Sequence, residues 1–148
     1  MIAVYLKQKR SRRLEHGYPR IWLQEVDRMD GVTKPGELVR VLDHRGTFIG
    51  TGIINTHAKV MVRMISHQLI KQMDESFFEV RLMQCQAYRS RFLPQTESYR
   101  LVNGEADFLP GLIIDRVGDI LLVRLLTAGM EVRRHLIKNV LVRLFAPK

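Results

Sequence analysis

Residues 37–65 read ELVRVLDHRGTFIGTGIINTHAKVMVRMI, and this stretch decides the fold class of the first half of the chain. The apolar period changes to two at residues 38–41, as it does in a strand with one buried face. The following Asp43-His44-Arg45-Gly46 is typical of a tight turn between antiparallel strands. Residues 48–54 and 59–65 continue the pattern, so we predict a meander that forms a compact barrel or sandwich.

The residues before this meander predict one strand and one short helix. Residues 2–6, IAVYL, are apolar enough for a first strand, and residues 7–16 have helical spacing with a strongly basic face. Gly17 is a natural helix stop, and Pro19 then favours extended chain. Residues 1–70 are therefore predicted to form one β-rich unit with a single small helix.

A longer helix is predicted to follow this first unit. Asp74 can cap its N-terminus, and Pro94 ends it at about residue 93. Apolar side chains spaced by four, three and seven residues form one stripe along it. The members of the stripe are Phe78, Leu82, Cys85 and Phe92. Residues 71–97 are thus predicted to contain a linking helix between two folded parts.

The last third of the chain returns to a strand pattern and then ends in a helix. Strands are predicted at residues 99–102, 112–115 and 120–126, and a helix at residues 131–145. Ile137, Leu141 and Leu144 are expected to face inward from this helix. Three strands and two helices make a thin unit with unpaired edges, and its strands are apolar enough to need cover on both sides. We therefore expect self-association through residues 99–148.

The charge of the chain points to its class of partner. The formal net charge is +9 and the sequence pI is near 10.2, which on a globular domain favours binding to nucleic acid over binding to an anionic membrane. Residues 1–70 hold 12 basic and 6 acidic side chains, so they are the expected contact surface. No apolar segment is long enough to span a membrane, and a single cysteine suits the reducing cytoplasm.

The densest basic cluster lies on the predicted first helix, where several cations can neutralise successive phosphates. A solvated helix face is the alternative. Arg20 and Trp22 follow, and their guanidinium and indole can stack on an unpaired base, although a lone tryptophan is more often part of a core. The predicted RNA-binding residues are Lys7, Lys9, Arg10, Arg12, Arg13, Arg20 and Trp22.

Three glycines in the meander superficially resemble a phosphate-binding loop. Gly46, Gly50 and Gly52 lie inside a predicted strand pair and are not followed by a helix. Glycine inside a strand more often marks a bulge or a close approach of two backbones. We therefore predict a structural role for these three residues.

The remaining candidates for chemistry also favour structural roles. The five histidines have no metal-ligand spacing, and Cys85 lies on a predicted buried stripe where it acts as a small hydrophobe. Four acidic residues lie within three positions of a Gly or Pro, where a turn needs a polar side chain. They are Glu105, Asp107, Asp115 and Asp119. We predict no catalytic residue, no metal site and no cofactor-binding residue in this chain.

Several stretches together resemble a known family. Residues 98–137, SYRLVNGEADFLPGLIIDRVGDILLVRLLTAGMEVRRHLI, are similar to the middle of the bacterial large-subunit ribosomal RNA cytosine-5 methyltransferases of the RlmI type. GYPRIWLQEV at 17–26, PGELVRVLDHRGTFIGTGIIN at 35–55 and DESFFEVRL at 74–82 fall in the order of that family. The resemblance therefore covers the whole chain.

The resemblance implies an α+β chain with three parts. Residues 1–70 would be a PUA domain, a small barrel that binds structured RNA, followed by the linking helix at 71–97 and an incomplete central α/β subdomain at 98–148. In the family, a Rossmann-like domain then binds S-adenosylmethionine at a glycine-rich turn and supplies a nucleophilic cysteine. This sequence reaches neither motif. It also has Tyr18-Pro19-Arg20 where the family usually has His-Pro-Trp, which exchanges an aromatic side chain for a cation.

The resemblance makes RNA, and specifically large-subunit ribosomal RNA, the expected partner. The leading interpretation is the RNA-recognition part of an S-adenosylmethionine-dependent ribosomal RNA methyltransferase in the cytoplasm, without catalytic residues in these 148 positions. Two alternatives stay open. One is a stand-alone PUA-type RNA-binding adaptor, and the other is one half of a split enzyme that a separate methyltransferase domain completes in trans.

Overall fold

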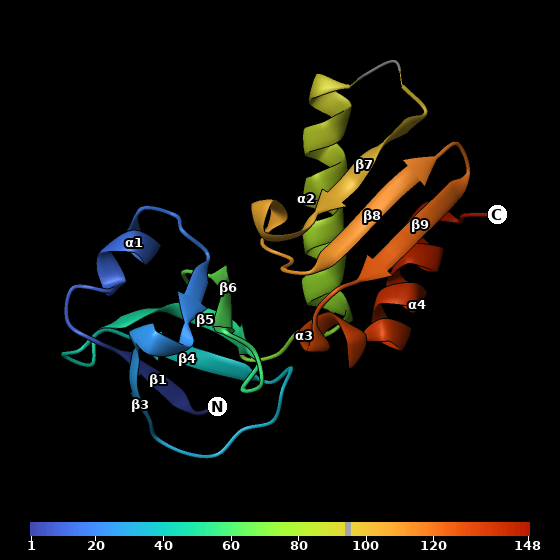
Figure 1. Ribbon diagram of the computed structural model, residues 1–148. Helices are drawn as coiled ribbons and strands as arrows, with labels where there is room; N and C mark the ends of the chain where they lie inside the picture. The colour runs from blue at the N-terminus through green and yellow to red at the C-terminus, as the bar shows by residue number, and fades with distance from the viewer. Residues whose placement is uncertain (94–95) are drawn as a thin grey trace. The chain divides into compact units, whose positions relative to one another are not determined.

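The computed structural model describes residues 1–93 and 96–148, without the side chain of Glu15. Contacts within the chain divide it into two compact units, Met1–Lys71 and Gln72–Lys148. The first unit contains a six-stranded sheet and the second a three-stranded sheet, drawn in Figure 1. Within the described residues, no helix is both long and apolar enough to cross a membrane.

The sheet of the first unit is a curled half-barrel with the strand order β2-β6-β5-β4-β1-β3 (Figure 1). Strands β1 and β4 are parallel, whereas all other neighbours are antiparallel. The elements in chain order are β1 (Ala3–Leu6), α1 (Ser11–Glu15), β2 (Arg20–Trp22), the 3-10 turn η1 (Leu23–Glu25), β3 (Val26–Met29), β4 (Leu38–Leu42), β5 (Phe48–Ile54) and β6 (Val60–Ser66).

The predicted meander is confirmed as β4, β5 and β6, and the predicted first strand as β1. Strand β3 was not predicted, because its sequence Val26-Asp27-Arg28-Met29 has no strand-like alternation. In the structure none of its four residues is fully buried. It forms where the edge of β1 offers backbone partners, and the Arg28 guanidinium lies 3.8 Å from the centre of the Tyr5 ring. Tertiary pairing thus creates a strand that local pattern does not indicate.

Two of the three glycines are required by close contact between β5 and β6. A Cβ atom at Gly50 would collide with the backbone oxygen of Ser66, and one at Gly52 would collide with a methyl group of Val62. Gly46 has a φ of +88° in the turn after Asp43, a conformation that favours glycine. The predicted structural role of these glycines is confirmed.

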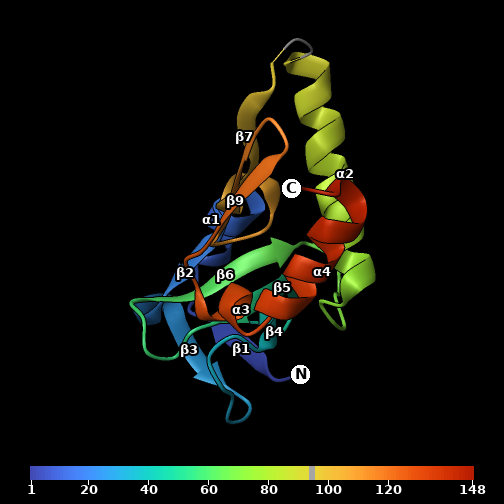
Figure 2. The ribbon, with the colours of Figure 1, turned by 90° about the vertical axis from the view of Figure 1, so that its right-hand side faces the viewer.

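The second unit packs two helices on one face of its sheet, as Figures 1 and 2 show from two sides. The antiparallel sheet has the order β7-β8-β9. The elements are α2 (Glu75–Phe92), β7 (Ser98–Asn103), the 3-10 turn η2 (Gly104–Asp107), β8 (Leu112–Val117), β9 (Ile120–Leu125), α3 (Ala128–Glu131) and α4 (Arg134–Phe145). Helix α2 contacts both β7 and α4, so it is part of this unit.

Helix α2 begins as the sequence predicts, because the Asp74 carboxylate accepts a hydrogen bond of 2.9 Å from the backbone N–H of Phe77. Phe78, Leu82 and Cys85 are buried, which confirms most of the predicted stripe. Phe92 is 59% exposed, so its predicted place on the stripe is wrong. The last turn of α2 extends past the sheet that covers the earlier turns (Figure 1). Pro94, the predicted end of the helix, lies outside the described residues.

The helix predicted at residues 131–145 is confirmed over Arg134–Phe145 as α4, and a separate short helix, α3, precedes it at Ala128–Glu131. The Arg133 guanidinium donates a hydrogen bond of 2.7 Å to the carbonyl of Gly129, in the last turn of α3. Ile137 and Leu141 are buried as predicted, together with Val140, whereas Leu144 is only half-buried. The buried face of α4 is therefore shifted from the predicted stripe toward Val140.

Candidate nucleic-acid interface

The predicted basic helix is shorter than the sequence indicates. Helix α1 contains only Ser11–Glu15, and Lys7, Lys9 and Arg10 lie in the turn before it. Lys9 has a φ of +66°, in the left-handed region, which a helix cannot pass through. Arg10 occupies the N-cap position without a side-chain hydrogen bond, and the first turn contains no acidic residue. Closely spaced cations without a cap do not favour a longer helix.

Most of the cluster is available to a partner. The side chains of Lys7, Lys9, Arg10 and Arg12 are exposed. None of the four makes an ion pair with any side chain that the structure describes. They therefore form a surface at one end of the half-barrel whose positive charge no described side chain compensates, which we call the basic cluster.

Arg13 differs from the other cations because it pairs with a buried carboxylate. Its guanidinium donates a hydrogen bond of 3.0 Å to Oε1 of Glu25, whose side chain is 7% exposed. The same guanidinium lies 4.1 Å from the centre of the Tyr18 ring. Arg13 remains 46% exposed, but part of its charge is compensated. Through these contacts Arg13 fixes the position of the segment that carries the basic cluster.

Glu25 organises this part of the unit, and sequence reasoning missed it. Its Oε2 accepts a hydrogen bond of 2.9 Å from the backbone N–H of Trp22, and its backbone oxygen accepts one of 2.9 Å from the N–H of Lys7. A buried carboxylate with charged and backbone donors is stable only while those partners are present. The three-residue spacing from Trp22 to Glu25 could have indicated this bond, as in a capping box.

Arg20 and Trp22 lie on strand β2, which pairs with β6. Arg20 is exposed and occupies the position opposite Arg63, while Trp22 is half-buried opposite Val60. The structure therefore brings Trp22 and Arg13 together at Glu25, and places Arg20 beside a second arginine. Arg63 was missed because it alternates with buried residues in an otherwise apolar strand.

The predicted turn role is confirmed for three of the four acidic residues, since Glu105 and Asp107 lie in η2 and Asp119 lies in the β8–β9 turn, and it is wrong for Asp115. Asp107 makes a bidentate pair with Arg89 at 2.8 and 2.7 Å, and both side chains are nearly buried. Asp115 lies within β8 and binds Arg100 and Arg124. The hydrogen bond from Arg100 is the main cause that lowers the pKa of Asp115. Across the described residues, no group of acidic, histidine or cysteine side chains could hold a metal ion.

Cys85 is buried on α2, as predicted, with 5% of its surface exposed. Burial raises the pKa of its thiol to about 11, and nearby Asp107 contributes to the same shift. The thiol is therefore protonated at neutral pH, and a protonated, buried thiol is a poor nucleophile.

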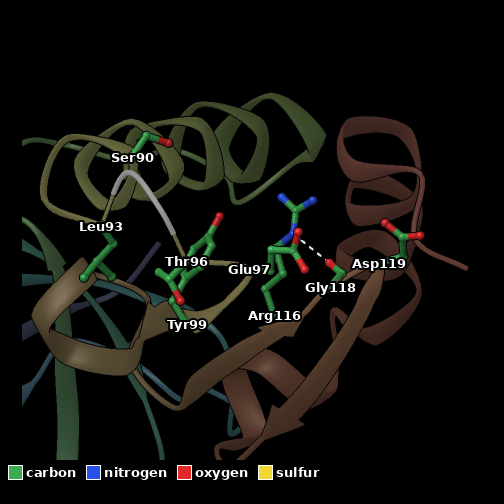
Figure 3. A pocket seen from close by; sticks show the side chains of 8 residues that line it. All are labelled: Ser90, Leu93, Thr96, Glu97, Tyr99, Arg116, Gly118 and Asp119. Atoms are coloured by element: carbon green, nitrogen blue, oxygen red, sulfur yellow. Dashed lines mark hydrogen bonds between the residues drawn. The ribbon is translucent and has the colours of Figure 1, made fainter.

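A cavity of about 580 Å³ lies between the end of α2 and the β8–β9 turn (Figure 3). Arg116 extends into it and donates a hydrogen bond of 3.0 Å to the carbonyl of Gly118. The cavity also holds the carboxylates of Glu97 and Asp119. One guanidinium against two carboxylates leaves no positive surplus, so this cavity does not suit a polyanion.

Comparisons with known proteins agree with this architecture. Residues 4–67 match the family model of the PUA-like domain. The ribosomal RNA large subunit methyltransferase I of Tolumonas auensis is 35% identical over 145 residues, which are 97% of this chain and 36% of that protein. The enzyme of the same name from Klebsiella pneumoniae is 34% identical over 142 residues, which are 95% of this chain and 36% of that protein.

Solved structures share the fold at low sequence identity. A protein from Streptococcus mutans described as a SAM-dependent methyltransferase matches 99% of this chain and 39% of its own, with a TM-score of 0.83 and 18% identity. A second methyltransferase structure, a complex with SAH, has a TM-score of 0.81, 18% identity and coverage of 99% and 38%. At this identity the likeness establishes the fold alone.

The half-barrel with its basic end is a PUA-like domain. The chain as a whole corresponds to the N-terminal portion of the ribosomal RNA large subunit methyltransferase I family, as its sequence resemblance implies. The chain spans a little over a third of the length of the curated relatives that it matches.

Proposed function

We propose that this chain binds structured RNA through its PUA-like unit, as the RNA-recognition part of a large-subunit ribosomal RNA methyltransferase. The observation that carries the proposal is the basic cluster, a surface of exposed cations without an ion-pair partner among the described side chains, at one end of a PUA-like half-barrel. Phosphate contacts supply most of the affinity of such surfaces, so cations without acidic partners are the favourable ones. The relatives' names supply the class of RNA, and the cytoplasm is its expected compartment.

Within this proposal the predicted residues have different roles. Lys7, Lys9, Arg10 and Arg12 contact phosphates, and Arg20, which is exposed on β2, also contacts the RNA. Trp22 is half-buried and bonded through its backbone to Glu25, so it supports the site more than it stacks on a base. Arg13 positions the cluster through the same Glu25.

Methyl transfer in the relatives requires a methyl donor, and we propose that S-adenosylmethionine binds outside residues 1–148. The second unit then serves as a platform beside the catalytic part. Its strand β9 pairs only with β8 in the described sheet, and two apolar side chains on one face of β9, Ile120 and Leu122, are 51 and 55% exposed. The same surface suits the alternatives of self-association or of a methyltransferase domain that binds in trans.

Salt dependence of RNA binding tests the proposal. Changing Lys9, Arg10 and Arg12 together to Ala removes up to three phosphate contacts, so the slope of log affinity against log salt concentration should flatten by about 2 to 3. Binding to a structured ribosomal RNA fragment is measured by fluorescence anisotropy at several salt concentrations.

The matched control replaces Lys34, Arg45 and Lys59 with Ala. These three residues are exposed in the same unit, and their replacement removes the same net charge. This control should leave the slope nearly unchanged. If the two triple variants changed the salt slope equally, a localised site would be contradicted, and RNA binding would depend only on the net charge of the chain. Binding to RNA that is unchanged in both variants would reject the proposal.

A further inference from the structure

The second unit carries a groove that the proposed function does not use. Helix α2 presents positions 81, 84, 85 and 88 on one stripe, because these spacings place side chains one above another. This stripe faces the turn η2 and the residue that follows it, Phe108. The groove between them has a volume of about 470 Å³, within the range of sites that hold small organic groups.

The floor of the groove is rigid and electrically balanced. The nearly buried Arg89 and Asp107 pair joins α2 to η2 through two hydrogen bonds. Arg89 also donates to the carbonyl of Arg100, and Asp107 accepts a bond of 2.6 Å from the N–H of Asn103. A bidentate pair with further bonds at each end fixes the relative position of the two walls. Cys85 fills the floor as a protonated, apolar side chain.

The walls of the groove present aromatic rings and a guanidinium. Tyr88 is 60% exposed and Phe108 is 39% exposed. The guanidinium carbon of Arg81 lies 5.4 Å from the centre of the Phe108 ring. Tyr88 is itself supported by Phe92, with ring centres 4.8 Å apart. Rings and a planar cation beside one groove are the groups on which unpaired nucleobases stack.

Phe108 is held in an unfavourable backbone conformation. Its φ of +56° and ψ of +29° are left-handed, a region that bulky residues rarely occupy. The hydrogen bonds of η2 hold it there, with the N–H of Phe108 bonded to Glu105 and the N–H of Leu109 bonded to Gly104. A glycine would adopt this conformation without strain, so burial and turn geometry alone do not explain a half-exposed aromatic ring here.

We propose that this groove binds one unpaired base of single-stranded RNA, stacked between Tyr88 and Phe108 beside the Arg81 guanidinium. Gln84 is exposed on the same stripe and offers both a donor and acceptors to the base edge. The occupant is a nucleotide and not a neutral apolar ligand, because the groove combines ring faces with a cation and the chain carries a surplus of positive charge. The second unit thus adds a base contact to the phosphate contacts of the first unit.

The full chain is tested with a fluorescein-labelled single-stranded RNA decamer by fluorescence anisotropy. Tyr88→Ala and Phe108→Gly should each weaken binding about 5- to 10-fold, because each removes one stacking surface. Tyr88→Phe should bind like the unchanged chain, since the ring is kept. Met83→Ala is the control, because Met83 is 48% exposed on α2 and does not line the groove.

Two further measurements separate stacking from folding and from the basic cluster. Phe108→Gly relieves the left-handed strain, so its melting temperature should stay equal or rise while its affinity falls. A ten-unit abasic strand keeps the phosphates but lacks bases, and it should bind the groove variants and the unchanged chain equally. A blunt-ended RNA duplex, which has no unpaired bases, should depend on Lys9, Arg10 and Arg12 and not on Tyr88.

The base site is rejected if Tyr88→Ala and Phe108→Gly bind the decamer as Met83→Ala does. It is also rejected if their loss of affinity is the same on the abasic strand. Because the blunt-ended duplex reports on the basic cluster separately, neither result would bear on the proposed function of the first unit.

Discussion

The two units solve the problem of a small sheet in different ways. The six strands of the first unit curl into a half-barrel around a core that includes Val4, Ile21, Val41 and Ile54, all almost fully buried. The three strands of the second unit have helices on one face only (Figures 1 and 2). On the other face, Asp115 lies between Arg100 and Arg124, next to exposed Ile120 and Leu122.

This difference indicates which unit depends on a partner. A curled sheet buries its apolar face with its own residues, whereas an open three-stranded sheet leaves edges and apolar side chains for another surface. We expect the first unit to be self-sufficient and the second to associate. The predictions below test this contrast in order of decreasing effect.

The largest effect is expected from separating the units. A fragment of residues 1–71 should remain monomeric and bind structured RNA, while the full chain and residues 72–148 should self-associate, as measured by light scattering. Replacing Ile120 and Leu122 with Lys should reduce that association, because charges on an edge strand oppose pairing with another chain. Aggregation of the 1–71 fragment alongside a monomeric full chain would reverse the contrast.

A core substitution in the second unit should leave the first unit intact. Phe78 is fully buried and makes an edge-to-face contact with Phe77, 5.4 Å between ring centres. Phe78→Ala should lower the free energy of unfolding of the second unit by about 3–5 kcal/mol, the usual cost of a large cavity. Hydrogen exchange should show fast exchange in residues 75–145 with slow exchange retained in β4 and β5. Loss of protection in both units would mean that they unfold together.

Removing Glu25 should weaken the first unit by a smaller amount. Glu25→Ala leaves the Trp22 N–H and the Arg13 guanidinium without their shared acceptor, at a cost of about 2 kcal/mol. Asp27→Ala is the control, because its ion pair with Arg28 is exposed and contributes at most about 0.5 kcal/mol. Chemical denaturation followed by Trp22 fluorescence measures both changes. Equal costs would show that Glu25 does not organise the segment that carries the basic cluster.

Alkaline pH should lower the stability of the second unit through Cys85. Its pKa is about 11 in the folded chain against 9.0 for an unperturbed thiol, so the folded state favours the protonated form. The contribution is constant below pH 9 and is lost as pH rises toward 11; at pH 10 it changes the unfolding equilibrium about tenfold. Cys85→Ala should lower stability overall yet remove this part of the pH dependence, measured by thermal unfolding at pH 8 to 10.5.

The smallest expected effect is the response to S-adenosylmethionine. We expect no stoichiometric heat of binding by calorimetry with the 148-residue chain, since among the described residues no glycine-rich turn follows a strand and opens a helix. A stoichiometric micromolar dissociation constant would overturn this prediction and give the second unit a role in cofactor binding.

Local pattern predicted much of the fold in both units. The period-two stretches became β4, β5 and β6, and Asp74 capped α2 as its side chain requires. Sequence pattern gave wrong predictions where contacts with another part of the chain determine the secondary structure. Strand β3 depends on the edge of β1, and the first helix was overestimated because Lys9 is left-handed. Hydrophobic periodicity reports burial of one element and contains no information on such pairings.

For the candidate site, the sequence by itself determined where positive charge accumulates, since composition and spacing need no fold. Only the tertiary structure decided which side chains lie next to each cation. Arg13 forms an ion pair with Glu25, twelve positions along the chain, and Arg20 lies opposite Arg63 on the neighbouring strand. The groove at Tyr88 and Phe108 likewise exists only because Arg89 and Asp107, 18 positions apart, join a helix to a turn. Long-range contacts of this kind depend on the path of the chain in space, which local physical chemistry does not determine.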